Sequence, residues 1–205
     1  MASVPASPLR RIVVLIAWLL AAALALHFLS TAHAKYAHVD AATYGMFWTR
    51  RHWLWVHLAG GVLAMVLGSA QFIGPLRRAW PRVHRWIGRT YLLGVLIGLV
   101  GAVALIATSP APIAIRIAFA GIAIAWAITA TVGYVWIRRQ DVLRHQRWMI
   151  RNYLVTLAPA LFRLMLLVPG VMALASPMVM IPLLLWLSWV APLMVYESAR
   201  RCWSR

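Results

Sequence analysis

Acidic residues are almost absent from this chain: its 205 residues include three, against 20 lysines and arginines, which gives a formal net charge of +17. Lys35 is the single lysine, and Cys202 is the single cysteine. One cysteine excludes an internal disulfide and a cluster of thiolate metal ligands. The apolar runs also lack a carboxylate pair, a nucleophile triad, a phosphate-binding loop and zinc-ligand spacing. Hydrolase, NTPase and metalloprotease functions therefore have no support.

Apolar residues, by contrast, make up 64% of the chain, and the mean hydropathy is +0.82. No ordinary soluble domain combines these values with so few acids. The arginines stand in short clusters between apolar runs, a pattern typical of loops that contact anionic lipid headgroups. We therefore expect a lipid bilayer with anionic headgroups as the partner of this charge, and no nucleic acid.

Six apolar runs are long enough to cross a hydrocarbon core of about 30 Å as helices. They cover residues 12–30, 53–76, 90–115, 117–137, 152–168 and 178–197, with breaks at arginine clusters and at Pro or Gly pairs. The sequence predicts an all-α integral membrane protein that forms a single membrane domain, 1–205. Its four-helix core would cover 53–168, and the helices 12–30 and 178–197 would flank it.

The distribution of basic residues predicts the orientation. In the six-helix arrangement, fifteen arginines fall on one side and four basic residues on the other. Both termini are therefore expected in the cytoplasm, with the protein in the inner (plasma) membrane of a bacterial cell. An alternative remains for the N-terminus, because Arg10 and Arg11, an apolar run and a small-residue segment at 32–34 resemble a cleavable signal. Cleavage would leave five helices and a mature start near Lys35.

The two basic connections resemble each other at an offset of 62 residues. They share the pattern R-W-x-x-R-x-Y, which begins at Arg85 in the first copy and at Arg147 in the second. This pattern indicates that the second and third spans, and the fourth and fifth, are two parallel copies of one hairpin. The alternative is two independent basic anchors with interfacial aromatic residues.

Polar residues at membrane depth are expensive, so their angular positions point to a functional interior. His145, Asn152, Thr156 and Arg163 fall within about 20° of one line on a continuous fifth helix. Arg163 would then need a backbone carbonyl, Glu197 or an anionic ligand such as a propionate or quinone oxygen as its partner. The alternative is that Arg163 reaches the outer headgroups. On the second span, one line within about 40° holds the two polar residues His57 and Gln71 and the small residues Gly61, Ala64 and Gly68.

Two histidines open matching helices of the two copies. His84 opens the third span and His145 the fifth, so both imidazoles are expected at the cytoplasmic interface. Two imidazoles suit the axial positions of one haem b, Arg85 and Arg147 would neutralise its propionates, and Gly88 would leave room for the porphyrin. The alternative is that they are ordinary interfacial histidines. A second haem at His57 is less favoured, because its partner would have to be a histidine outside the core.

Five short stretches carry a resemblance to a known family. They are HLAGG at 57–61, GSAQF at 68–72, PRVHRWIGRTY at 81–91, IRRQDV at 137–142 and HQRWMIR at 145–151. With these stretches the chain resembles the bacterial membrane proteins grouped as domain of unknown function family 2306. The resemblance implies a helical membrane protein with motif residues His57, Gln71, His84, His145 and Arg163. A weaker likeness is to transmembrane cytochromes b of the ascorbate-reductase type.

The sequence supports two classes of function. The first is a membrane electron-transfer protein with one b-type haem between His84 and His145, with a quinone or another membrane redox protein as its partner. The second is a non-catalytic membrane protein, either a small transporter or an assembly subunit, that uses Arg163 for an anion or for helix packing.

Overall fold

The computed structural model describes residues 8–203, and in that range the chain contains helices and connections but no strand. The elements are α1 (Pro8–Tyr36), α2 (Ala41–Tyr44), η1 (Gly45–Arg50), α3 (Arg51–Ala70), α4 (Gly74–Ala79), α5 (Pro81–Ala107), α6 (Ile113–Arg138), α7 (Val142–Thr156), α8 (Ala158–Leu166), η2 (Val171–Ala173) and α9 (Pro177–Trp203). Six segments are long and apolar enough to cross a membrane. The prediction of six spans in an all-α protein is confirmed.

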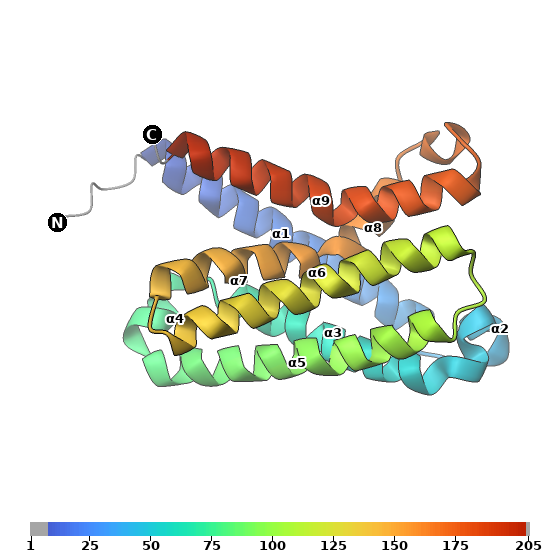
Figure 1. Cartoon of the computed structure of the whole chain (residues 1–205), viewed down its shortest axis with the longest axis horizontal. Helices are drawn as coiled ribbons and strands as arrows, with labels where there is room; N and C mark the ends of the chain where they lie inside the picture. The colour runs from blue at the N-terminus through green and yellow to red at the C-terminus, as the bar shows by residue number, and fades with distance from the viewer. Residues whose placement is uncertain (1–7, 204–205) are drawn as a thin grey trace.

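The long helices run side by side, and Figure 1 shows that α1 begins and α9 ends at the same end of the bundle. The connections from α3 to α5 and from α6 to α7 lie at that end as well. Most of the arginines belong to these segments, so we call this the arginine-rich end. The side chains of Arg10 and Arg11, and the whole of Arg205, lie outside the described part of the structure.

Four helices form the core: α3 packs most extensively on α5, and α6 on α7. Glycines permit the first of these contacts. A Cβ atom on Gly60 would overlap the backbone nitrogen of Gly98, so the two backbones touch where these residues meet. The sequence pattern placed Gly61 on the inner line of α3. In the structure a Cβ on Gly61 would meet open space, and the close contact belongs to its neighbour.

The two copies of the basic hairpin place matching residues in matching surroundings. Arg89 lies 5.2 Å from the ring of Trp86, and the corresponding Arg151 lies 4.7 Å from Trp148. The tyrosines at the end of the shared pattern, Tyr91 and Tyr153, are both 1% exposed and belong to one apolar core cluster. The shared arginine–tryptophan contact and the equal burial of the two tyrosines support the interpretation of a duplicated hairpin.

Local signals set several helix boundaries. Pro81 stands in the first turn of α5, where its missing N–H leaves no hydrogen bond broken. Asp141 caps α7, because its carboxylate accepts a hydrogen bond from the Arg144 N–H at 2.9 Å. Asp40 caps α2 in the same way and accepts from the backbone N–H and the hydroxyl of Thr43. These hydrogen bonds stabilise the carboxylate and lower the pKa of Asp40.

The expected continuous fifth helix is wrong. α7 ends at Thr156, and α8 begins at Ala158 with a proline, Pro159, in its first turn. Proline has no N–H to donate to the preceding turn and its ring clashes there, which breaks the helix. The inner line predicted from one continuous helix therefore stops at Thr156. Arg163 lies beyond the break, so its direction no longer follows that line.

The first and last helices attach to the core through aromatic side chains. Trp18 of α1 stacks on Phe72 with ring centroids 3.9 Å apart. Trp186 of α9 lies against α6, where a Cβ on Gly121 would overlap its ring. The last helix is also longer than the predicted range 178–197, since α9 covers Pro177–Trp203.

Candidate functional site: a buried polar network beneath two histidines

A hydrogen-bonded network crosses the middle of the bundle. The Tyr91 hydroxyl donates to Oδ1 of Asn152 and lies 3.3 Å from Oγ1 of Thr156. The indole N–H of Trp126 donates to the same Thr156 oxygen at 2.8 Å. The amide nitrogen of Asn152 donates to Oγ1 of Thr129 at 2.8 Å and to the backbone carbonyl of Trp126 at 2.9 Å. The network therefore joins α5, α6 and α7.

Burial makes these bonds necessary. Asn152 is 0% exposed and Tyr91 is 1% exposed. A polar group without a partner at this depth costs several kcal/mol, by the general estimate for hydrocarbon surroundings. Both groups on the Asn152 side chain have partners, so the network holds three helices in one arrangement. The sequence-based inner line is right for Asn152 and Thr156.

Sequence reasoning missed Trp126 and Thr129 as members of this network. A signal for them exists in the sequence. Trp126 stands in the middle of a long apolar run, far from the interfacial positions where membrane tryptophans gather. Thr129 follows one turn later, on the same face of α6. A tryptophan N–H at mid-membrane needs an acceptor, which points to a polar partner on a neighbouring helix.

The two histidines lie above this network. His84 precedes Tyr91 by seven residues and His145 precedes Asn152 by seven, which is two helical turns in both cases. Because Tyr91 and Asn152 bond to each other, the same faces of α5 and α7 carry the two imidazoles toward the interior at the arginine-rich end. The imidazoles are near enough to interact electrostatically.

The ring nitrogens of the pair differ in their partners. Nδ1 of His145 lies 2.8 Å from the backbone carbonyl of Gly133. A carbonyl only accepts, so this nitrogen carries the proton and Nε2 keeps a free lone pair. Nδ1 of His84 is buried and has no hydrogen-bond partner. Most buried polar atoms in proteins are paired, so an unpaired ring nitrogen beside a second imidazole needs an explanation.

Other predicted residues surround the pair to different degrees. The Gln71 amide donates to the backbone carbonyl of His84 at 3.3 Å, and its Oε1 lies 3.2 Å from where a Cβ on Gly88 would be. The missing side chain of Gly88 therefore makes room for Gln71. Arg147 is partly buried and lies about 160° around α7 from His145, whereas Arg85 is exposed and lies about 100° around α5 from His84.

His57 and Arg163 do not join this group. His57 belongs to the other half of the bundle, and its Nδ1 lies 2.9 Å from the Gly98 carbonyl. The Arg163 guanidinium lies 4.5 Å from the ring centre of Phe28 and interacts electrostatically with Tyr36, both on α1. The expectation that Glu197 could neutralise Arg163 is wrong, because Glu197 has other partners.

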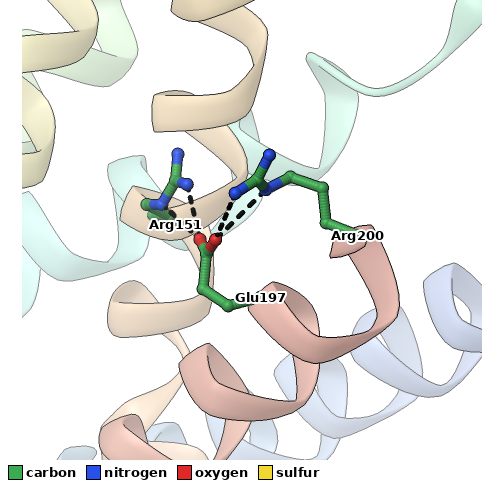
Figure 2. Close-up of polar contacts among 3 residues, drawn as sticks. All are labelled: Arg151, Glu197 and Arg200. Atoms are coloured by element: carbon green, nitrogen blue, oxygen red, sulfur yellow. Dashed lines mark hydrogen bonds and ion pairs between the residues drawn. The ribbon is translucent and has the colours of Figure 1, made fainter. Parts of the chain in front are cut away.

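Glu197 links the last helix to the core. Figure 2 shows its carboxylate between two guanidinium groups, those of Arg151 from α7 and Arg200 from α9. The Arg151 nitrogens lie 2.7 Å and 2.5 Å from Oε1, and those of Arg200 lie 3.1 Å and 3.0 Å from Oε2. Sequence reasoning missed this contact, because 46 positions separate Arg151 from Glu197 and no local pattern connects them.

The six apolar helices and the buried network of interhelical hydrogen bonds define the class: this is a multi-pass helical membrane protein. Residues 54–198 match the family described as Predicted membrane protein (DUF2306), and the match covers well over half of the chain. The chain therefore belongs to that family. No curated protein and no solved structure matches it.

Proposed function

We propose that this protein is a b-type cytochrome-like electron-transfer protein with one haem between His84 and His145. The observation that carries the proposal is the hydrogen bond between Tyr91 and Asn152. It joins the two helices two turns away from the histidines, so both imidazoles point into the same space. Two histidines on facing helices are the ligand set that a low-spin haem takes.

The state of the imidazoles supports this assignment. The Gly133 carbonyl holds the proton of His145 on Nδ1, which leaves Nε2 free to bind a metal, as in most metal-binding histidines. Iron would also be a partner for the His84 ring, whose Nδ1 has no hydrogen-bond partner among the described residues. The described residues hold no group of three or more His, Cys, Asp or Glu side chains, so the pair suits a two-ligand haem site better than a zinc site.

The surrounding residues would have separate tasks. Of the two arginines predicted to neutralise the propionates, Arg147 is partly buried and Arg85 is exposed, so Arg147 would be the one to neutralise a propionate. Gln71 occupies the space over Gly88, so it would form one wall of the haem site and would have to turn its amide aside. Bound haem would supply one-electron transfer, with a quinone or another membrane redox protein as the partner. Arg163, at the other half of the bundle, would face a separate anion.

A spectrum of detergent-purified protein tests the proposal. With haem supplied during expression, the reduced-minus-oxidised difference spectrum should show the bands of a low-spin b-type haem, and a pyridine haemochrome test should be positive. His84→Ala and His145→Ala should each abolish the bands. His57→Ala is the matched control and should keep them, because His57 bonds the Gly98 carbonyl in the other half of the bundle. Haem-free wild-type protein would refute the proposal.

The second candidate is a non-catalytic membrane protein, either a small transporter or an assembly subunit. Arg163 favours it, because this half-buried cation lies over the ring of Phe28, and the ion pairs among the described residues belong to other arginines. An anionic substrate or a partner helix would neutralise it. This candidate would be favoured if the purified protein contains no haem and if deletion of its gene leaves the redox chain of the host cell functional.

The proposed membrane orientation places the arginine-rich end in the cytoplasm, with the protein in the inner membrane of a bacterial cell. We also propose that α1 is retained, because Trp18 stacks on Phe72 and its removal would expose the aromatic core cluster. A reporter that fluoresces only in the cytoplasm, fused after Arg205, should be bright. N-terminal sequencing of the membrane-extracted protein should not find a start at Lys35.

A further inference from the structure

A hollow of about 270 Å³ lies on the outward face of α5 at the arginine-rich end. Its lining consists of Arg82, Arg85, Trp86 and Arg89, all of them exposed. The Arg89 guanidinium lies 5.2 Å from the centre of the Trp86 ring. Three guanidinium groups on one helical face repel one another, so an anion between them would stabilise this surface.

Among the described residues, no acidic side chain lies beside this hollow. The chain contains three acidic residues. Asp40 accepts hydrogen bonds from Thr43 in the connection after α1. Asp141 pairs with Arg144 at 3.3 Å, and Glu197 pairs with Arg151 and Arg200. All three acidic side chains therefore have partners elsewhere, and none of them neutralises the three arginines of the hollow.

In the second copy of the hairpin, carboxylates of the chain itself neutralise the corresponding arginines. Arg82 and Arg89 correspond to Arg144 and Arg151 at the offset of 62 residues. In the second copy Asp141 neutralises the first of these arginines and Glu197 the last. In the first copy the residue corresponding to Asp141 is an alanine, and the outward face of α5 meets no acidic helix. The same arrangement is thus complete in one copy and open in the other.

The position of the hollow identifies the anion. Arg89, Leu93, Leu96 and Val100 follow one another along one face of α5, at spacings of four, three and four residues. All four side chains are exposed, so this face passes from cations to apolar side chains that contact hydrocarbon. Trp86, also exposed, is a residue type that gathers at the membrane interface. A ligand that matches this face has an anionic head and an apolar tail.

We propose that this hollow binds the phosphate group of an anionic phospholipid, with the acyl chains along Leu93 and Leu96. Arginine suits such a ligand because its planar guanidinium donates paired hydrogen bonds to phosphate oxygens. The lipid phosphate would take the place at α5 that the carboxylates of Asp141 and Glu197 take at α7. The proposal is independent of haem binding, since the hollow faces away from the histidine pair.

Native mass spectrometry of the purified full chain tests the site by titration with phosphatidylglycerol and phosphatidylcholine. The variant Arg82→Gln, Arg85→Gln, Arg89→Gln should lose affinity for phosphatidylglycerol by about fivefold for each arginine removed. A matched control removes three exposed arginines outside the hollow at the same end, with Arg78→Gln, Arg138→Gln and Arg139→Gln. The control should keep its preference for phosphatidylglycerol over phosphatidylcholine.

Two results would overturn the proposal. Equal losses in the two triple variants would mean that phosphatidylglycerol responds to overall charge and not to this hollow. Competition by inorganic phosphate or glycerol phosphate at the same concentrations would mean that the ligand is free phosphate and not a lipid. A monodisperse elution profile from size-exclusion chromatography confirms that each variant is folded before the titration.

Discussion

The tyrosines that end the two copies of the shared pattern offer a matched test of the buried network. Tyr91→Phe and Tyr153→Phe remove the same hydroxyl from two residues that are both 1% exposed. Neither change leaves a large cavity, because phenylalanine fills nearly the same volume. The structure nevertheless predicts unequal effects, since the two hydroxyls have different partners.

The magnitudes follow from what each hydroxyl leaves behind. Tyr91 is the donor to Oδ1 of Asn152, and the amide nitrogen of Asn152 already has two acceptors, so the amide cannot turn to compensate. A buried acceptor without a donor costs about 1–3 kcal/mol. Tyr153 donates to the backbone carbonyl of Met65 at 3.2 Å, inside α3. Loss of an interhelical hydrogen bond of this kind in a membrane costs about 0.6 kcal/mol.

Thermal unfolding of detergent-purified protein, followed by fluorescence-detected size-exclusion chromatography, provides the assay. For a chain of this length 1 kcal/mol shifts Tm by about 2–4 °C. At the middle of its range, about 2 kcal/mol, Tyr91→Phe should therefore lower Tm by about 4–8 °C, and Tyr153→Phe, at about 0.6 kcal/mol, should lower it by about 1–2 °C. Asn152→Leu added to Tyr91→Phe should cost less than the two single changes together, because it removes the unpaired oxygen. Equal shifts for the two tyrosines would refute the reasoning.

Three further changes test other contacts, all by the same unfolding assay unless stated. Gly60→Ala should destabilise the protein by about 1–3 kcal/mol because its Cβ meets the α5 backbone, whereas Gly61→Ala should be neutral or stabilising by up to about 1 kcal/mol; equal effects would contradict the packing. Glu197→Gln should lower the free energy of unfolding by about 1–2 kcal/mol, since Arg151 loses its carboxylate partner. An unchanged Tm would show that the pairing of Glu197 with Arg151 and Arg200 does not stabilise the fold. Asp40 has a lowered pKa in the folded state, so the stability it adds is present above its unfolded pKa of about 4 and is lost as the pH falls through the folded value. After correction for the intrinsic pH dependence of amide exchange, the hydrogen-exchange protection of residues 41–44 should fall in acid, and Asp40→Asn should remove that fall.

Much of the architecture is readable from the sequence because a hydrocarbon core acts on every residue in the same way. Runs of apolar residues, arginine clusters and Pro or Gly breaks predict six spans, and the structure confirms them. Periodicity predicts that Asn152 and Thr156 face inward, and both are buried. These features depend on local composition and helical geometry alone.

The sequence-based predictions are wrong where a helix break or a small rotation of a helix changes the direction in which side chains point. The line through Arg163 assumed one continuous helix, and the break before Ala158 removed that assumption. The sequence pattern placed Gly61 at the helix contact, whereas the structure has Gly60 there. The two positions differ by one residue, which is about 100° around α3. Periodicity groups residues on one face of a helix, but the neighbouring helix sets the exact direction in which that face packs.

The sequence by itself determined the shortage of acids, the six apolar helices and the arginines between them, because lipid, water and helix geometry act on short segments. Only the tertiary structure decided how the three acids and the histidines are used. Glu197 pairs with Arg151 across 46 positions, and Tyr91 meets Asn152 across 61, since packing of whole helices brings those side chains together. The arginine hollow on α5 also depends on tertiary structure. Only the positions of the acidic side chains in space show that they pair with other arginines and not with those of the hollow.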